Sequence, residues 1–534
     1  MPFLRTKNYQ TFEVVDETTD RVIYAFEGAS NAAKALLNDS VELDISGNLL
    51  LKDRAPHPPL AGYLELNSKT THGHTSRGIP LYLFVPLNTA YPSFIVASKE
   101  TDRSQKRIAV VEFLEWTGHL PRGAIKHLLG AAGTLEAEEE ALLWNACPYK
   151  NLTEGLAVLE DDAPQRRLIE GTTFNIDPEG CRDVDDCITI AQDAEGITLT
   201  ITISDVASCI EELGAVDIMA AAQGQTLYRD GYAVRPMLPP FFSEEHCSLL
   251  AGTERRGISL AIRIEDGKVV GEEWFESTLH NNETYTYDSF LSSPHASGVQ
   301  RCAAVLANSE SDDPHVWIET FMKYYNLAAA KLLLAAGTGI LRTHSEPDLA
   351  RMEKYKAMDP ALGTLATSAA SYTLIGSQTT YAHWGVDAAA YCHATSPIRR
   401  YADLANQRIL KQLIRSKAEG LFVSVPVSDL NMRAKISKGY ERDRAFLHAV
   451  LDGSREFEAR ILDQVEEGDR MKLTLWVPAW QQRIKYRCKR LGEQIVSADE
   501  TMKRTVVEGQ ILRFRLGLNL GARRWKDRLV IEFV

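Results

Sequence analysis

Apolar and polar residues alternate with a period of two in several short stretches near both ends of the chain. A first series lies between about residues 60 and 130, where AGYLELN, IPLYLFVP, SFIVAS and KRIAVVEFLEW precede the helix-like PRGAIKHLLG. The last 80 residues contain five further runs, namely EFEARILDQV, MKLTLWV, QQRIKYRCK, GQILRFRLG and RLVIEFV. Five strands in such a length are typical of an OB-type barrel, so we predict one barrel in each region.

The remaining parts of the chain show different patterns. The first 58 residues have short strand signals and a helix predicted over Ala29 to Asn38, which indicates either a degraded third barrel or an appendage. In the centre, CITI and ITLTITI flank a turn and predict a hairpin, while IETFMKYYNLAAAKLLLAAG predicts a helix that ends at a glycine. The segment PIRRYADLANQRILKQLI places Ile398, Tyr401, Ala402, Ala405 and Ile409 on one helical stripe. We therefore expect a central α+β domain.

Composition and charge narrow the class of protein. The 534 residues are 45% apolar and 25% charged, which is ordinary for a globular protein. The net charge is −13, but residues 471–534 carry 14 Lys and Arg against 6 Asp and Glu, a balance of +8. A basic module on an acidic body suits a polyanion, although a basic barrel that merely keeps itself soluble explains the same pattern.

The absence of membrane, secretion and zinc-binding motifs predicts where the protein is found and which metal it does not bind. It has no run of 18 apolar residues and no signal-peptide core, so we expect a soluble, cytoplasmic protein without a membrane partner. Its eight cysteines form no CxxC pair, which argues against a zinc site and indicates reduced, mostly buried thiols.

The strongest chemical motif is FNIDPEGCRDVDDCITI. It places Asp177, Asp183, Asp185 and Asp186 within ten residues, just before a predicted strand. Four carboxylates so close together repel one another unless a cation neutralises them, and hard oxygen ligands suit Mg²⁺ or Mn²⁺. An EF-hand is excluded, because its glycine position holds Ile188. The alternative is a solvated acidic turn that binds no metal ion.

A second motif, HATSPIRRYADL, resembles an anion site. Thr395 or Ser396 is a good N-cap, Pro397 suits the first helical position, and Arg399 and Arg400 follow directly. Backbone N–H groups and guanidinium groups would then converge where a phosphate could lie. A routinely capped helix with two solvated arginines explains the segment equally well on its own.

These motifs and others along the chain carry a family resemblance. The order IDPEGCRDVDD, ISDV, PMLPPFFSEEHCSL, YTYDS, ETFMKYYN, ILRTHSEP, AHWG, TSPIRRYADL and YERDRAF resembles the catalytic domain of the ribonuclease II family of 3′→5′ exoribonucleases, from about residue 166 to residue 451. Members of that family flank this domain with cold-shock-type OB barrels before it and an RNA-binding OB barrel after it. The predicted domains are accordingly 1–58, 59–150, a linker over 151–165, the catalytic domain over 166–453 and the last barrel over 454–534.

The resemblance also implies roles for single residues. Asp177 and Asp186 would bind a catalytic Mg²⁺, for which Mn²⁺ can substitute. Asp185 would help to bind the second ion or the attacking water, and Asp183 would complete the acidic cage. Arg399 would hold the phosphate near the scissile bond, with Arg400 in support.

Aromatic and acidic residues of the middle segments acquire roles in the same way. Tyr287 matches a tyrosine beside the 3′-terminal nucleotides, Tyr228 one that stacks on RNA at the channel entrance, and Glu441 an acidic residue at the end of the cavity. One position departs from the family, because this chain has Thr338 where bacterial ribonuclease II has an aromatic residue that clamps the terminal base. Either another residue, such as His344, supplies the ring, or the terminal bases are held more loosely.

The leading hypothesis is a monomeric, Mg²⁺-dependent hydrolase that degrades single-stranded RNA processively from its 3′ end to nucleoside 5′-monophosphates and leaves a short oligonucleotide. The alternative is a catalytically inactive RNA-binding protein of the same fold, which has no need for all four aspartates. A nuclease for DNA is disfavoured by the resemblance alone, because carboxylate-bound Mg²⁺ does not itself distinguish the sugar.

Overall fold

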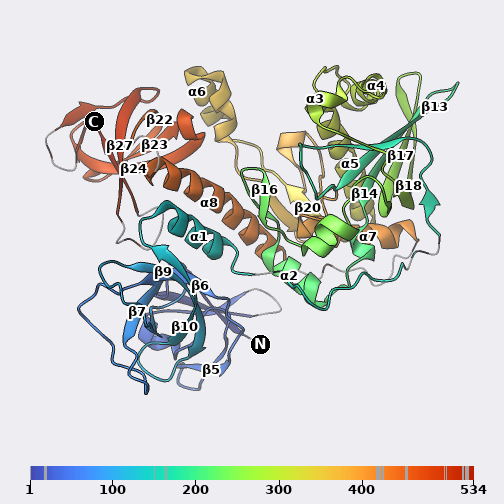
Figure 1. Ribbon diagram of the computed structural model, residues 1–534. Helices are drawn as coiled ribbons and strands as arrows, with labels where there is room; N and C mark the ends of the chain where they lie inside the picture. Colours follow the sequence, from blue (N-terminus) through green and yellow to red (C-terminus); the bar gives the residue numbers. More distant parts are fainter. Residues whose placement is uncertain are drawn as a thin grey trace. The chain divides into compact units, whose positions relative to one another are not determined.

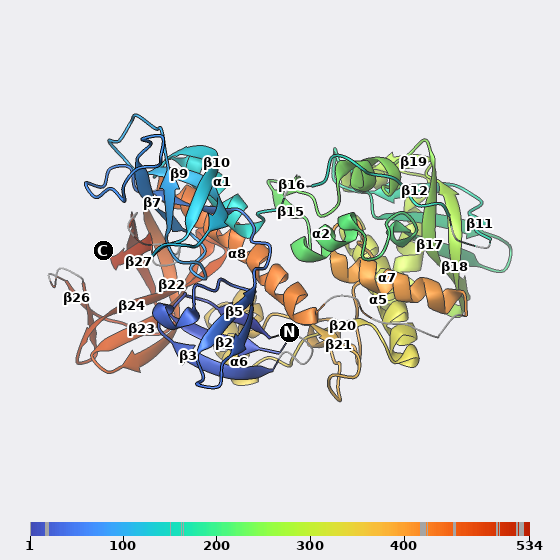
Figure 2. The ribbon, with the colours of Figure 1, turned by 90° about the horizontal axis from the view of Figure 1, so that it is seen from below.

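A computed structural model of the chain divides it into two compact units (Figures 1 and 2). One unit comprises Met1–Tyr149 together with Lys438–Val534, and the other is Lys150–Ser437. No helix in the described part of the chain has both the length and the apolar character needed to cross a membrane. The structure describes residues 2–16, 21–149, 151–161, 163, 165–416, 423, 426–451, 455–497, 500, 502–519, 522 and 528–534.

The N-terminal segment forms an antiparallel sheet of five strands in the order β3-β2-β1-β4-β5. The strands are β1 Phe3–Thr6, β2 Thr11–Val15, β3 Val22–Glu27, β4 Ser40–Leu43 and β5 Leu49–Asp53. The helix predicted over Ala29 to Asn38 is wrong: only a 3-10 turn over Ala29–Ala32 forms, and it ends where Ala33 and Lys34 adopt left-handed backbone angles (φ 49° and 62°). Two consecutive left-handed residues cannot continue an α-helix.

A closed barrel follows, in the order β10-β8-β7-β6-β9, which confirms the predicted OB barrel. Its elements are β6 Leu60–Leu64, β7 Leu81–Pro86, β8 Phe94–Ala97, β9 Arg107–Glu115 and β10 Arg122–Ala131, followed by helix α1 Leu135–Ala146. The helix-like reading of PRGAIKHLLG is wrong, because this segment is β10. It closes the barrel by pairing with both β8 and β9, and this pairing overrides its helical pattern.

The C-terminal sheet contains all five predicted runs. It has seven strands in the order β26-β25-β24-β23-β22-β27-β28. The strands are β22 Glu456–Glu467, β23 Arg470–Val477, β24 Gln482–Leu491, β25 Gln494–Val496, β26 Lys503–Thr505, β27 Ile511–Leu518 and β28 Leu529–Phe533. In β24 the buried Ile484, Tyr486 and Cys488 alternate with exposed basic residues, so the charge predicted for this module lies on one face. Arg523, Arg524 and Lys526, which contribute to the positive balance counted for residues 471–534, lie outside the described residues.

The second unit is the predicted α+β domain, built on a seven-stranded sheet in the order β11-β18-β17-β14-β13-β12-β19. Its strands are β11 Arg167–Leu168, β12 Thr173–Ile176, β13 Asp186–Gln192, β14 Ile197–Ser204, β17 Glu254–Glu265, β18 Lys268–His280 and β19 Glu283–Tyr285. The predicted hairpin is β13–β14, and its turn is held by Asp193 Oδ1, which accepts from the N–H groups of Glu195 and Gly196.

Helices and two short hairpins complete this unit. The helices are α2 Ala215–Gln223, α3 Tyr287–Phe290, α4 Ala296–Ala307, α5 Pro314–Ala336, α6 Leu349–Met358, α7 Tyr401–Ile414 and α8 Val427–Leu451, whose end belongs to the first unit. The hairpins are β15 Leu227–Arg229 with β16 Tyr232–Arg235, and β20 Ile340–Thr343 with β21 Ser371–Leu374. As predicted, α5 ends at a glycine, where Gly337 takes the left-handed angle φ 71°.

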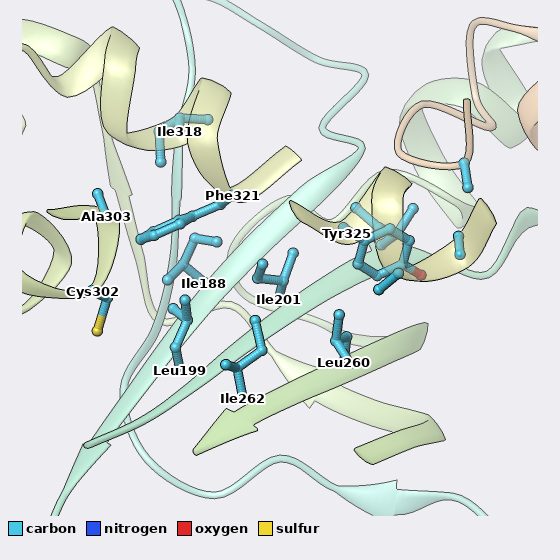
Figure 3. Packing of buried hydrophobic residues seen from close by; sticks show 14 of the residues in the cluster. Ile188, Leu199, Ile201, Leu260, Ile262, Cys302, Ala303, Ile318, Phe321 and Tyr325 are labelled. Atoms are coloured by element: carbon cyan, nitrogen blue, oxygen red, sulfur yellow. The ribbon is translucent and has the colours of Figure 1, made fainter. Parts of the chain in front are cut away.

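The core of this unit lies between the sheet and helices α4 and α5 (Figure 3). Its labelled residues are Ile188, Leu199, Ile201, Leu260 and Ile262 from the strands and Cys302, Ala303, Ile318, Phe321 and Tyr325 from the helices. Both faces of the β13–β14 hairpin are largely buried, which holds the start of β13 in a rigid position.

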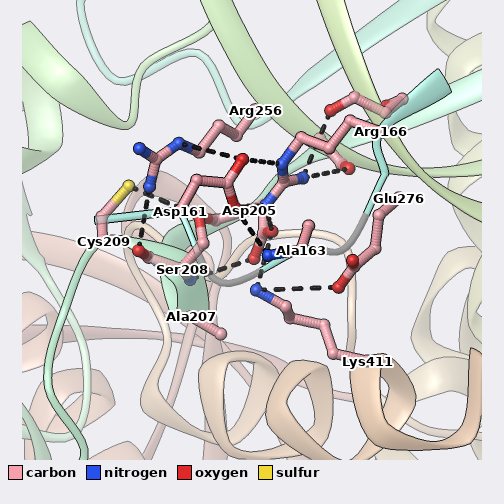
Figure 4. Close-up of polar contacts among 12 residues, drawn as sticks. Asp161, Ala163, Arg166, Asp205, Ala207, Ser208, Cys209, Arg256, Glu276 and Lys411 are labelled. Atoms are coloured by element: carbon pink, nitrogen blue, oxygen red, sulfur yellow. Dashed lines mark hydrogen bonds and ion pairs between the residues drawn. The ribbon is translucent and has the colours of Figure 1, made fainter. Parts of the chain in front are cut away.

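A buried ion network fixes α7 against the sheet (Figure 4). Asp205, which follows β14, accepts from Lys411 Nζ of α7 at 2.9 Å and from Arg166 Nη2 at 2.8 Å. Lys411 also lies 3.9 Å from Glu276 of β18. Because Asp205, Lys411 and Glu276 are each no more than 5% exposed, this network sets the position of α7 and of the segment that precedes it.

Candidate active site

Strand pairing brings Asp177 and Asp186 together at one edge of the sheet. Asp177 follows the last residue of β12, and Asp186 is the first residue of β13. These two strands are antiparallel neighbours, with Phe174 opposite Ile188, so the end of one lies beside the start of the other. Burial and the neighbouring Asp177 charge raise the pKa of Asp186 well above its ordinary value, and the pKa of Asp177 is raised chiefly by burial.

Asp177 is positioned by a residue that the sequence analysis did not single out. Asn175 Nδ2 donates to Asp177 Oδ2 at 2.8 Å, and Asn175 Oδ1 accepts from Asn281 Nδ2 at 2.8 Å and from the Thr284 hydroxyl at 2.9 Å. The i, i+2 spacing within an extended segment places Asn175 and Asp177 on the same face, and that spacing is the signal that could have indicated the pair.

Asp185 is held by two donors from the TSPIRR segment. The Ile398 N–H donates to its Oδ1 at 3.0 Å, and Arg399 Nε donates to its Oδ2 at 2.9 Å. Asp185 is 4% exposed, and burial raises its pKa to about 7 in spite of the opposing Arg399 charge. The convergence of N–H and guanidinium donors predicted for this segment is therefore present, but the anion that it binds here is the carboxylate of Asp185.

The predicted start of the helix in this segment is wrong. Helix α7 begins at Tyr401, and Pro397 lies in a turn before it. The Thr226 N–H donates to the Arg399 carbonyl at 3.0 Å, and the Tyr401 N–H donates to the Gly224 carbonyl at 2.9 Å. This bridge to the segment after α2 draws Arg399 and Arg400 out of the helix, so neither Thr395 nor Ser396 caps it.

The two arginines differ in what they can bind. Arg399 uses only Nε on Asp185; its side chain is 43% exposed, and its two Nη groups make no hydrogen bond within the described residues. Arg400 Nη2 instead pairs with Asp403 Oδ1 at 2.8 Å inside the fold. Arg399 is thus free to hold a phosphate, whereas the contacts of Arg400 are structural, and its predicted role toward RNA stays a prediction.

Tyr228 lies within the carboxylate cluster, as part of β15. Its hydroxyl donates to Asp183 Oδ2 at 2.7 Å, and burial together with the Asp183 charge raises its pKa above the ordinary value. That Tyr228 stacks on RNA stays a prediction. Its hydrogen bond shows a second role, because the Tyr228 hydroxyl positions the Asp183 side chain.

Tyr287 lies beside the same carboxylates. Burial and the charges of Asp177 and Asp186 raise its pKa to about 12. One face of its ring stacks on His315 at the start of α5, with ring centroids 3.7 Å apart and planes 16° apart. Nothing local in the sequence relates the start of α5 to Tyr287, so His315 could not be predicted as its partner.

Three positions discussed for the sequence lie elsewhere. Glu441 is exposed on α8, in the part of that helix that belongs to the first unit, so its predicted place at the end of the cavity stays a prediction. Thr338 follows the end of α5, and His344 lies beyond β20, where it contacts His383 and Trp384.

The hydrogen bonds and burial of the four carboxylates indicate which of them could bind a metal ion. Asp185 and Asp183 are bound by donors of the protein, but the Asp186 carboxylate receives no hydrogen bond from the described residues. Those residues contain no group of three or more His, Cys, Asp or Glu side chains already arranged as a metal centre. The pair Asp177 and Asp186 nevertheless fits a hard cation, because both are oxygen donors whose burial and mutual repulsion a cation would relieve.

Comparison with known proteins agrees with this fold. The family model described as "RNB domain" matches residues 165–309 and 291–416, and "Dis3-like cold-shock domain 2" matches residues 81–146. Exoribonuclease 2 of Aeromonas hydrophila is 25% identical over 407 residues, which cover 60% of this chain and 60% of that protein. The chain thus spans about 60% of the length of this relative.

Solved structures show the same architecture. RNase R of Mycoplasma genitalium, in complex with ribose-methylated single-stranded RNA, superposes with a TM-score of 0.71 at 16% identity and 100% coverage of both chains. Yeast Ssd1, a pseudonuclease, gives a TM-score of 0.60 at 17% identity over 91% of this chain and 78% of Ssd1. Residues 165–416 therefore form an RNB domain, the catalytic domain of the ribonuclease II family, and residues 81–146 form a Dis3-like cold-shock domain.

Proposed function

We propose that the chain is a divalent-metal-dependent exoribonuclease that hydrolyses single-stranded RNA from its 3′ end and releases nucleoside 5′-monophosphates. The observation that carries this proposal is the meeting of Asp177 and Asp186 beside the Asp185–Arg399 pair. A protein that only binds RNA gains nothing from buried carboxylates whose charges repel both one another and the RNA.

Each residue of the site has a task in this proposal. Asp177 and Asp186 would hold Mg²⁺ or Mn²⁺, and such an ion would supply activation of the attacking water and charge stabilisation for the leaving 3′ oxygen. Arg399 would hold the adjacent phosphate through its free Nη groups, since Asp185 fixes only its Nε. Tyr287 offers the ring face that His315 leaves uncovered, and the terminal base would stack there.

In this proposal the C-terminal sheet would supply a basic face for RNA, which processive action requires. On β24, Lys485 is exposed and has no ion-pair partner among the described residues. Arg487 and Arg490, in contrast, pair with Glu467 at 3.1 Å and with Glu466 at 2.7 Å, so the usable positive charge is smaller than the sequence count.

The decisive experiment uses a 5′-labelled oligoribonucleotide, the full-length protein and Mg²⁺. We expect a ladder or a short limit product from the 3′ end, loss of hydrolysis in EDTA and in Asp186→Asn, and retained binding by that variant. Hydrolysis by Asp186→Asn within tenfold of the wild type would contradict the assignment of the metal ligands.

The similarity to the yeast pseudonuclease favours one alternative, an RNA-binding protein without activity. In that case the wild type would bind the oligoribonucleotide with an affinity that does not depend on Mg²⁺, and no product would form with any divalent ion.

A further inference from the structure

A cavity of about 690 Å³ lies outside the carboxylate site, in the same compact unit. Its walls come from the end of β20 (residues 343–346), from residues 369–371 and from residues 378–389. Its volume falls within the range of about 300–1,000 Å³ that is typical of ligand sites.

Aromatic rings form one wall of this cavity. Trp384 lines it and is 40% exposed, an unusual exposure for so large an apolar ring. His344 meets Trp384 edge to face, with ring centroids 5.9 Å apart and an interplanar angle of 85°, and it meets His383 at 5.1 Å. These contacts hold the indole in place at the cavity wall.

The chain fixes this wall through the two nitrogens of His344. Its Nε2 lies 2.9 Å from the Ser368 carbonyl, and its Nδ1 accepts from the Gly385 N–H at 3.2 Å. A Cβ on Gly385 would lie 2.9 Å from that nitrogen, so the close approach of the 383–387 turn requires a glycine. Both nitrogens of His344 are engaged and His383 is only 9% exposed, so the 40% exposed Trp384 is the ring that offers the most surface to a ligand.

The charge of the walls selects the part of a nucleotide that could bind. Among the fourteen lining residues, Glu346 and Asp387 are acidic and none is a lysine or an arginine. A phosphate would be repelled, whereas a neutral base can stack on the indole and donate its exocyclic amino group to a carboxylate. Hydroxyl and amide groups of Thr343, Ser371 and Gln378 add further hydrogen-bonding partners.

The cavity is connected to the carboxylate site through a single packed segment. From the cavity wall the chain passes through Tyr391 and His393 to Arg399, and the rings follow one another: His383 to Tyr391 at 5.1 Å and Tyr391 to His393 at 5.9 Å. The Arg342 N–H of β20 donates to the Tyr391 carbonyl at 2.7 Å. An RNA strand whose phosphate lies on Arg399 could therefore place a base farther along its length in the cavity.

We propose that this cavity is a base-binding subsite for a nucleotide upstream of the 3′ end, with Trp384 as the stacking platform and a preference for bases that carry an amino group. This proposal rests on the proposed function. It also explains how the chain holds RNA although Thr338 offers no aromatic ring.

The test uses binding by the Asp186→Asn protein, so that hydrolysis does not interfere. Trp384→Ala should weaken the binding of a long oligoadenylate by at least about fivefold, as expected for one lost stack, while Trp384→Phe stays within twofold of the parent. Leu349→Ala is the matched control, since Leu349 is 52% exposed on α6 and does not line the cavity. Glu346→Gln should reduce the preference for oligoadenylate over oligouridylate.

Photo-crosslinking locates the subsite without any hydrolysis. With 5-iodocytidine, whose base carries an amino group, placed at each position of an oligoribonucleotide in turn, one internal position should give an adduct on the peptide that contains Trp384. The proposal is overturned if no position gives that adduct, or if Trp384→Ala binds as tightly as Leu349→Ala. A failure of the proposed function would appear separately, as a wild-type protein that forms the adduct but makes no product.

Discussion

Replacement of Asp186 by asparagine should have opposite effects on stability and on activity. Burial and the neighbouring carboxylates raise the pKa of Asp186 well above its ordinary value, so its charged form is costly in the folded protein without metal. An asparagine side chain at this position would lack that charge. At neutral pH in EDTA we therefore expect Asp186→Asn to be more stable than the wild type.

The pH dependence gives the sign of this effect. A carboxyl whose pKa is raised by folding contributes its full stability only below its unfolded pKa, and that contribution is lost as the pH rises through the folded pKa. The advantage of Asp186→Asn should thus be small near pH 4 and should grow above it. Differential scanning calorimetry in EDTA would measure it as a Tm increase of about 2–4 °C for each kcal/mol, the range for a unit of this size.

Mg²⁺ should reverse the order. An ion that binds only the folded protein stabilises it according to its concentration relative to the Kd, so Mg²⁺ should raise the Tm of the wild type more than that of Asp186→Asn. Hydrolysis should fall by at least about a hundredfold, because a metal ligand is lost. The reasoning is refuted if the variant is less stable in EDTA or if Mg²⁺ raises both Tm values equally.

Four further outcomes are expected. Tyr287→Ala should lengthen the limit product seen on sequencing gels, because a terminal stack worth about 1–3 kcal/mol is lost, and an unchanged length would assign Tyr287 to packing alone. An all-DNA oligonucleotide should bind but be cut far more slowly, and equal rates would indicate a nuclease that does not distinguish the sugar. Lys485→Ala should make the dependence of log affinity on log salt less steep by about 0.7. Lys489→Ala is the control: Lys489 already pairs with Glu500, so its loss should change the slope less. Equal slopes for the wild type and Lys485→Ala would show that β24 does not contact RNA. Lys411→Met should lower the free energy of urea-induced unfolding by about 3 kcal/mol. This value is near the lower end for a broken buried ion pair, because Asp205 still pairs with Arg166. A change below about 1 kcal/mol would show that the network is dispensable for stability.

Local patterns in the sequence were sufficient for the α+β class of the central domain, for the strands on either side of it and for the identity of the acidic motif, but not for the class of the first 58 residues. The alternation in MKLTLWV and GQILRFRLG appears in the structure as strands with one buried and one exposed face. The four aspartates could be recognised because their crowding is a property of ten consecutive residues. Where a local pattern was misleading, as in PRGAIKHLLG, pairing with two neighbouring strands decided the outcome.

By itself the sequence determined the α+β class, the strands of the barrel over β6–β10 and of the C-terminal sheet, and the four carboxylates, since these depend on neighbours within a few residues. Only the tertiary structure decided what each group touches. Asp185 binds the Ile398 N–H, 213 positions along the chain, and Asp183 accepts from Tyr228 across 45 positions. The stack of Tyr287 on His315 and the exposure of Trp384 in its cavity likewise depend on how distant segments pack. Such contacts follow from strand pairing and buried ion pairs over long separations, which no local period or spacing encodes.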